Sequence, residues 1–162
     1  FDGEPLEEVL QRFEANHGIA VVSDRWALED LGLGPDEPIE ARIPAGVPLA
    51  AALEYVLAPL DCTYVVRSGV LCVTTVEAAA APDYLAVAIY PVADLLQDSS
   101  YDRLMETIAN VIDVDTWATN GGGEGAELVP FPQRGALFVS TTLVTHEKVA
   151  ALLSGLRQLS ID

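Results

Sequence analysis

Three groups of residues in this chain have the types that could do chemistry: a glycine-rich stretch, a cluster of acids and two histidines. Gly121, Gly123 and Ala126 fit the pattern Gly-x-Gly-x-x-Ala, in which backbone amides and a helix N-terminus bind a pyrophosphate. That mechanism needs a strand before the glycines and a helix after them. Here a strand is expected to follow, and Glu124 would repel phosphate. We therefore predict a flexible loop.

Acids near this loop could offer oxygen ligands to Ca²⁺, namely Asp113, Asp115, Glu124 and Glu127. An EF-hand loop needs a ligand at its fifth position, which from Asp113 is Trp117. A chain with 25 acids could also contain a pair of catalytic carboxylates, but no spacing selects two of them. The pattern favours solvated loop acids over a metal site.

The histidines are His17 and His146. His17 is expected at a helix C-terminus, where its charge would favour the helix dipole, and His146 in the first turn of the last helix. Neither has a Ser or Cys nucleophile nearby in a recognisable motif. We therefore predict no catalytic residue, no bound cofactor, no metal ion, and a chain that is not an enzyme.

The two tryptophans, Trp26 and Trp117, lie outside the main periodic segments. We expect each to plug the open end of its domain. The alternative is an exposed anchor for a partner chain.

A helix followed by a β-rich segment occurs twice in the first half of the chain. Pro5 and Pro48 each open a helix that carries an apolar stripe, and each helix runs into a β-rich segment. The first stripe is Leu6, Val9, Leu10 and Phe13, and the second is Leu49, Ala52, Leu53, Val56 and Leu57. Two such units predict a small α+β module with two helices on one sheet.

The first half predicts a strand end at 1–2, a helix from Pro5 that Gly18 caps, and a strand at 19–22. A short helix capped by Asp24 follows, then a strand at 39–43, a helix at 48–57 and a hairpin of 63–67 with 70–75.

The second half predicts a strand at 84–90, a helical turn through Leu96, a long helix capped by Ser99 or Ser100, a hairpin of 128–131 with 136–141, and a last helix. The long helix should bury Leu104, Ile108, Val111 and Ile112, and the last one Val149, Leu152, Leu153 and Leu156.

The predicted fold class is α+β, with two small domains that each pack helices on a small mixed sheet. Their orders are β-α-β-β-α-β-β, with a short extra helix after the second strand, and β-α-β-β-α. Four alanines at 78–81 precede Pro82, so we place the boundary there, with domains at 1–79 and 83–162.

Cys62 and Cys72 are predicted to be free thiols. If Ser68 and Gly69 form the hairpin turn, Val65 pairs with Cys72. Cys62 then lies three positions away on the opposite sheet face, about 10 Å along the strand, too far for a disulfide.

The net charge of −17 excludes two classes of partner. Nucleic acids and anionic membrane surfaces draw affinity from basic side chains, and both halves of this chain are acidic. The charge is expected to keep the protein soluble; the alternative is that it serves to bind a basic partner. No apolar run approaches the roughly 20 residues of a membrane span, so no direct membrane insertion is expected.

The first half resembles the secretin and TonB short N-terminal domain. The matching features are Phe1-Asp2, Pro5-Leu6 with Val9-Leu10, the run from Gly18 to Val22, Pro48-Leu49 with Leu53, and the hairpin from Tyr64 to Leu71. The second half is similar to the ring-building (KH-like) domains of secretins, through Tyr90 to Leu95, Leu137 to Thr141 and His146 to Val149. The two halves together also resemble planctomycete secretin-like proteins.

This resemblance implies a non-enzymatic module for protein–protein contact or assembly in a periplasmic or cell-envelope protein, of the secretin, type II or III secretion, or pilus type. Its partners would be other protein subunits or envelope proteins, with a homo-oligomer in the full-length protein. The alternative is a ligand- or partner-sensing module of a large extracytoplasmic protein without ring assembly.

Overall fold

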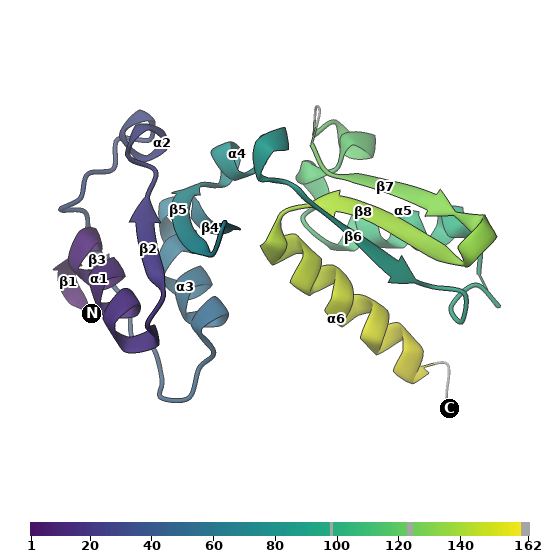
Figure 1. Ribbon diagram of the computed structural model, residues 1–162, viewed down its shortest axis with the longest axis horizontal. Coiled ribbons are helices and arrows are strands. Elements are labelled where there is room, and N and C mark those ends of the chain that lie inside the picture. Colours follow the sequence, from purple (N-terminus) through teal and green to yellow (C-terminus); the bar gives the residue numbers. More distant parts are fainter. Residues whose placement is uncertain (98, 123–124, 160–162) are drawn as a thin grey trace. The chain divides into compact units, whose positions relative to one another are not determined.

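The computed structural model describes residues 1–97, 99–122 and 125–159, and it confirms the predicted α+β fold of two small domains. The chain divides into two compact units, Phe1–Ala79 and the part from Ala80 onward. Each has its own helices and strands, which follow the predicted order (Figure 1).

The first unit, all of which the structure describes, has five strands that form two sheets, whereas the sequence predicts one. Strands β1 and β3 pair antiparallel in one sheet. The other has the order β2-β5-β4, with β2 parallel and β4 antiparallel to β5. The bounds are β1 Asp2–Pro5, α1 Leu6–His17, β2 Ala20–Ser23, α2 Arg25–Asp30, β3 Pro38–Glu40, α3 Leu49–Leu57, β4 Cys62–Arg67, β5 Val70–Thr75 and α4 Val76–Ala79.

Helix α1 forms as its sequence predicts. Its apolar stripe, Leu6, Val9, Leu10 and Phe13, is buried, which is the usual source of stability for a helix of this length. Gly18 ends the helix in the left-handed conformation, with φ 64°, where a residue without Cβ is unstrained. The helix contacts β2 of one sheet and β1 and β3 of the other.

The hairpin of β4 and β5 has the predicted register, with Val65 opposite Cys72 and Arg67 opposite Val70. Ser68 and Gly69 both have positive φ, as a two-residue turn of type I′ requires. Cys62 faces Thr75, not Cys72, and both thiols are free.

The described residues of the second unit form one sheet with the order β6-β8-β7, and both pairings are antiparallel. Two helices, α5 and α6, pack on one face of it around Leu137 and Val139. The predicted helical turn before α5 is a hydrogen-bonded turn, in which the Leu95 amide donates to the Val92 carbonyl (3.0 Å). The bounds are β6 Ala86–Pro91, α5 Tyr101–Val111, β7 Glu127–Phe131, β8 Ala136–Thr141 and α6 Leu143–Leu159.

The predicted buried face of α5 needs one correction. Ser100 caps the helix by accepting a hydrogen bond from the Arg103 amide (3.3 Å), and Leu104, Ile108 and Ile112 are buried. Val111 is 63% exposed. The helix ends there and Ile112 is extended, so Ile112 turns into the core and Val111 does not.

Within residues 1–97, 99–122 and 125–159, no helix has both the length and the hydropathy needed to cross a membrane.

Candidate functional site

The glycine-rich stretch packs closely against the backbone of its own loop. A Cβ atom at Gly122 would lie 2.5 Å from the Thr116 carbonyl oxygen, and one at Gly125 would lie 2.7 Å from the same oxygen. Strand β7 follows at Glu127, not a helix, so the arrangement of a dinucleotide site is missing there. Gly123 and Glu124 lie outside the described residues.

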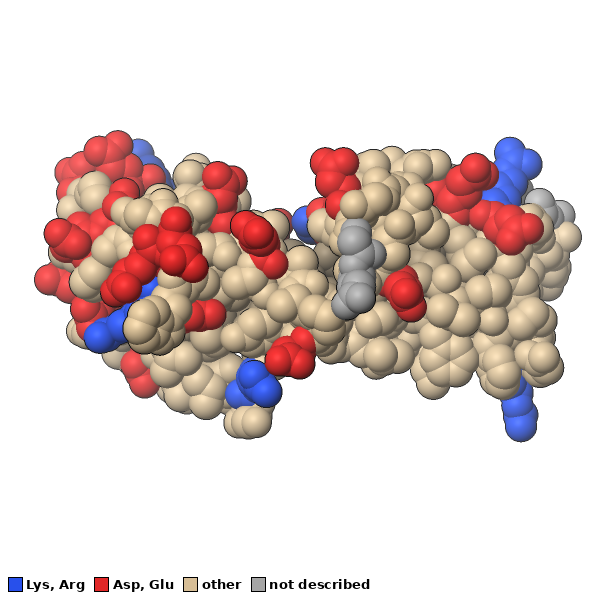
Figure 2. All heavy atoms as spheres, turned by 90° about the horizontal axis from the view of Figure 1, so that it is seen from above, with Lys and Arg blue, Asp and Glu red and all other residues tan. Residues whose placement is uncertain are grey.

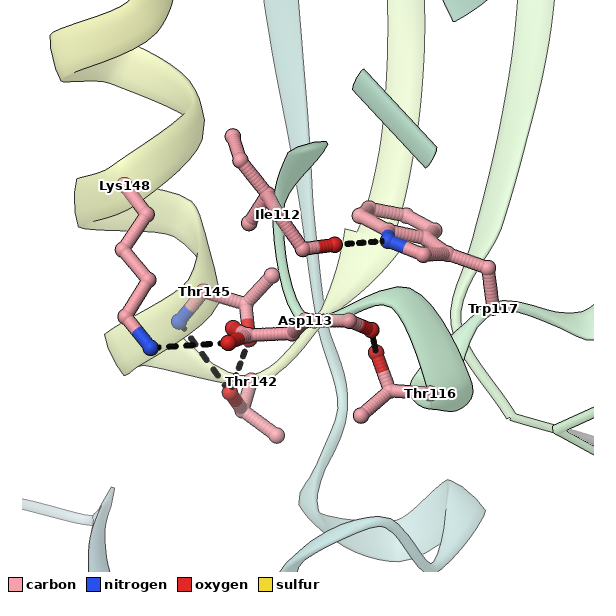
Figure 3. Close-up of polar contacts among 7 residues, drawn as sticks. All are labelled: Ile112, Asp113, Thr116, Trp117, Thr142, Thr145 and Lys148. Atoms are coloured by element: carbon pink, nitrogen blue, oxygen red, sulfur yellow. Dashed lines mark hydrogen bonds and ion pairs between the residues drawn. The ribbon is translucent and has the colours of Figure 1, made fainter. Parts of the chain in front are cut away.

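Asp113 joins this loop to the last helix (Figure 3). One carboxylate oxygen accepts a hydrogen bond from the Thr145 hydroxyl (2.7 Å), and the other contacts the Lys148 ammonium at 2.8 Å. The Asp113 carbonyl accepts from the Thr116 hydroxyl (2.7 Å). Each carboxylate oxygen of Asp113 therefore makes a structural contact with α6.

The acids predicted near this loop do not converge where the structure describes them. In the part of the chain that the structure describes, no group of three or more His, Cys, Asp or Glu side chains could hold a metal ion. Asp115 and Glu127 are exposed, as expected for solvated loop acids.

His146 is buried and joins α6 to β6, a role that the sequence did not indicate. Its Nε2 lies 2.8 Å from the Ala86 carbonyl oxygen, and its Nδ1 lies 2.9 Å from the Tyr90 hydroxyl. The two rings stack with centroids 5.9 Å apart. His17 ends α1, as predicted, and stacks on Phe13. Both histidines thus have structural contacts.

The two thiols are weak nucleophiles at neutral pH. Burial raises the pKa of the Cys62 thiol to about 11, with a smaller contribution from the Asp61 carboxylate. Burial also raises the pKa of Cys72, and the nearby Asp24 carboxylate adds to the effect. Because the thiolate is the reactive form, neither cysteine is activated for catalysis.

The tryptophans have opposite environments. Trp117 is 1% exposed in the core of the second unit, and its indole N–H donates to the Ile112 carbonyl (2.6 Å). Trp26 is 82% exposed on α2. The expectation that each tryptophan plugs its domain is therefore wrong for Trp26, because Leu28 is the α2 side chain that enters the core.

The second unit has an apolar sheet face that none of its described helices covers. On β6, Val87 is 68% exposed and Ile89 is 59% exposed, and on β7 Val129 and Phe131 are exposed. The central row is apolar across all three strands, because Phe138 of β8 pairs with Ile89 on one side and Val129 on the other. We call Val87, Ile89, Val129, Phe131 and Phe138 the open sheet face.

The rest of this face is mostly uncharged. A second row consists of Pro91, Ala136 and Phe131, and a third of Val87, Ser140 and Glu127. Phe131 packs edge-on against Phe138, with centroids 5.4 Å apart. A contiguous apolar surface of this kind marks a contact with another molecule more often than a single exposed side chain does.

Sequence reasoning missed this face although a signal was present. The segment from Ala86 to Tyr90 is apolar at every position, and a strand that is apolar on both sides is normally covered on both sides. The second half predicts only two helices of any length, enough for one face of a three-stranded sheet. The signal was that the strands are apolar on both faces, whereas the predicted helices suffice to cover only one face.

Comparisons with known proteins gave structural likenesses only. A scan against protein-family models found no match, and a search of curated proteins found none. The type IV competence pilus secretin PilQ of V. cholerae is similar at 14% identity and a TM-score of 0.37, over 96% of this chain and 37% of that one. This chain therefore spans well under two thirds of the length of PilQ.

Two further structures are similar at the same level. The N-terminal domain of the secretin XcpQ from Pseudomonas aeruginosa has 16% identity and a TM-score of 0.32, over 100% of this chain and 63% of that one. The GspC–GspD complex of enterotoxigenic Escherichia coli has 15% identity and a TM-score of 0.30, over 95% and 93%. These are loose likenesses at low sequence identity.

Proposed function

We propose that this chain is a non-enzymatic module for protein–protein contact and assembly, and that copies of it associate through the open sheet face of the second unit. The observation that carries the proposal is the apolar row of Ile89, Phe138 and Val129, on a face that no helix covers in the part of the chain the structure describes. Apolar surface of this kind gains free energy when a partner removes it from water.

The residues considered above as candidates for catalysis or metal binding have contacts that support a structural role for them. The carboxylate of Asp113 binds Thr145 and Lys148, His146 binds Ala86 and Tyr90, and both cysteines have raised pKa values. The sequence resemblance to secretin N-terminal and ring-building domains supports placing the parent protein in the periplasm or cell envelope.

A second candidate is a partner-sensing module without assembly of identical copies. The observation that favours it is the net charge of −17, because like charges on identical copies oppose their close approach.

The test compares self-association of Ile89→Lys and Val129→Lys with that of Val111→Lys by sedimentation equilibrium. Val111 is a matched control, since it is exposed to a similar degree in the same unit but lies on α5, away from the sheet. We expect the original chain and the Val111 variant to associate, and the two sheet variants to weaken association by about tenfold or more, as for a central interface residue.

Equal association of all three variants would contradict the role of the open sheet face. A chain that stays monomeric up to a concentration of about 1 mM, where even an association with a Kd of about 1 mM would be seen, would contradict self-assembly. This result would favour the partner-sensing candidate.

A further inference from the structure

The first unit has a groove beside the free edge of strand β2. It encloses about 510 Å³ and is lined by α1, β2, α2 and the loop at 33–35. Its position is set by sheet order, because β2 is the outer strand of β2-β5-β4. Within the first unit, all of which the structure describes, no other strand pairs with this edge of β2.

Backbone groups of β2 point into the groove. The Asp24 amide, directly after β2, donates to the Val73 carbonyl of β5 (2.7 Å). Successive residues of a strand direct their backbone groups to opposite sides, so Val22 also faces β5, while Val21 and Ser23 face away from it. An edge with outward N–H and C=O groups is the template to which an extended peptide adds a strand.

The side chains of the groove are apolar at its floor and acidic at its rim. Leu6, Leu10 and Leu28 are buried at the floor. The charged lining residues are Glu7, Glu14, Glu29 and Arg25, so acids outnumber bases three to one. Figure 2 shows acidic side chains crowded over the unit that holds the N-terminus.

We propose that this groove binds an extended basic segment of a partner polypeptide, which adds a strand to β2 and places lysine or arginine side chains beside Glu7, Glu14 and Glu29. The outward backbone groups require an extended occupant, the floor accepts alternate apolar side chains, and the acidic rim selects basic ones. The site is separate from the open sheet face, so the two proposals can fail independently.

The first measurement uses a labelled nine-residue peptide of alternating valine and lysine, with blocked ends, titrated against the 162-residue chain. We expect binding that weakens as salt is added, amide shift changes at Val21 and Ser23 in NMR spectra, and no binding of a peptide of alternating valine and glutamate. A lack of binding of the lysine peptide up to about 1 mM would overturn the proposal.

The second measurement tests strand addition with two N-methylated forms of the peptide. One is methylated at all valines and the other at all lysines, so each removes the donors on one side of the extended backbone. We expect one form to bind about tenfold or more weakly, since it loses several hydrogen bonds to β2, and the other to bind as before. Equal binding of the two forms would overturn strand addition.

Charge variants of the chain test the rim. Glu14 and Glu29 lie in the last turns of α1 and α2, where a cation suits the helix dipole, so Glu14→Lys with Glu29→Lys should fold. We expect the double variant to bind the lysine peptide about tenfold more weakly. Glu106→Lys with Asp115→Lys, at two exposed acids of the second unit, changes the net charge by the same amount and should bind as the original chain does.

Equal loss of peptide binding in the Glu106 and Asp115 double variant would show a general charge effect and overturn the rim's role. Ile89→Lys on the open sheet face should bind the peptide unchanged. Loss of self-association with unchanged peptide binding, or the reverse, thus identifies which of the two proposals has failed.

Discussion

Asp113 holds an unusual backbone conformation together with two side-chain contacts. Its φ of 40° is left-handed, a region that Asp and Asn occupy more readily than other residues with a Cβ. From this position its carboxylate reaches Thr145 and Lys148 on α6, which lie 32 and 35 residues further along the chain. The residue therefore fixes the loop after α5 onto the last helix.

We expect Asp113→Ala to lower the free energy of unfolding of the second unit by about 2 kcal/mol, because it removes a partly buried hydrogen bond and a partly exposed ion pair. Asp113→Asn should cost about half as much, since the amide keeps an acceptor and tolerates the left-handed conformation. Urea unfolding followed by amide NMR signals of α6 measures both. Asp115→Ala, an exposed acid in the same segment, is the control, and an equal loss there would contradict this role of Asp113.

At the scale of elements, the connection from α5 to β7 depends on close backbone packing. Gly125 approaches the carbonyl oxygens of Thr116 and Gly122, at 2.7 and 2.8 Å from where a Cβ atom would stand. The Ala126 amide donates to the same Thr116 carbonyl (3.2 Å), and the Ala118 amide donates to the Ala126 carbonyl (2.9 Å). The glycines thus have a steric reason to be in this loop.

Gly125→Ala should lower the stability of the second unit by about 2 kcal/mol, as overpacking against backbone atoms does. Gly155→Ala is the matched control, because Gly155 lies in α6 with no atom near the added methyl group. There alanine should raise stability by about 0.5–1 kcal/mol through helix propensity. Thermal unfolding of the two variants gives the comparison. Similar melting temperatures would contradict the steric explanation.

The elements of this chain follow from local sequence, but their exposed faces do not. The stripe of α1, the cap at Gly18 and the register around Ser68 and Gly69 are set within a few residues, so the sequence predicts them. The exposure of Val111 depends on where α5 ends, and that of Ile89 on which face the helices cover. The covered face of the sheet is decided by helices far from Ile89 along the chain, and the groove beside β2 likewise depends on its pairing with β5.

At the scale of the whole molecule, each unit has a buried core of its own. Leu53 and Leu57 of α3 are among the buried residues of the first unit, and Ile108 and Val149 belong to the core cluster of the second. The charge is also shared, with 14 acids and 4 basic residues at 1–80 and 11 acids and 4 basic residues at 81–162.

We expect each core to control the stability of its own unit only. Leu53→Ala should destabilise the first unit by about 3 kcal/mol, and Ile108→Ala the second by a similar amount, as for fully buried aliphatic residues. Amide hydrogen exchange, read separately for each unit, measures both effects in one chain. A similar loss of protection in both units of either variant would contradict separate domains at 1–79 and 83–162.

The contrast between the two indoles gives the protein a built-in optical reporter. The ring of Trp26 is open to water on α2, whose residues Arg25, Leu28 and Glu29 line the groove, while the ring of Trp117 is enclosed. A soluble quencher of fluorescence will therefore reach one emitter and leave the other bright. If a bound peptide shields α2, quenching of the Trp26 fluorescence should decrease, and this can be measured without a label on the protein.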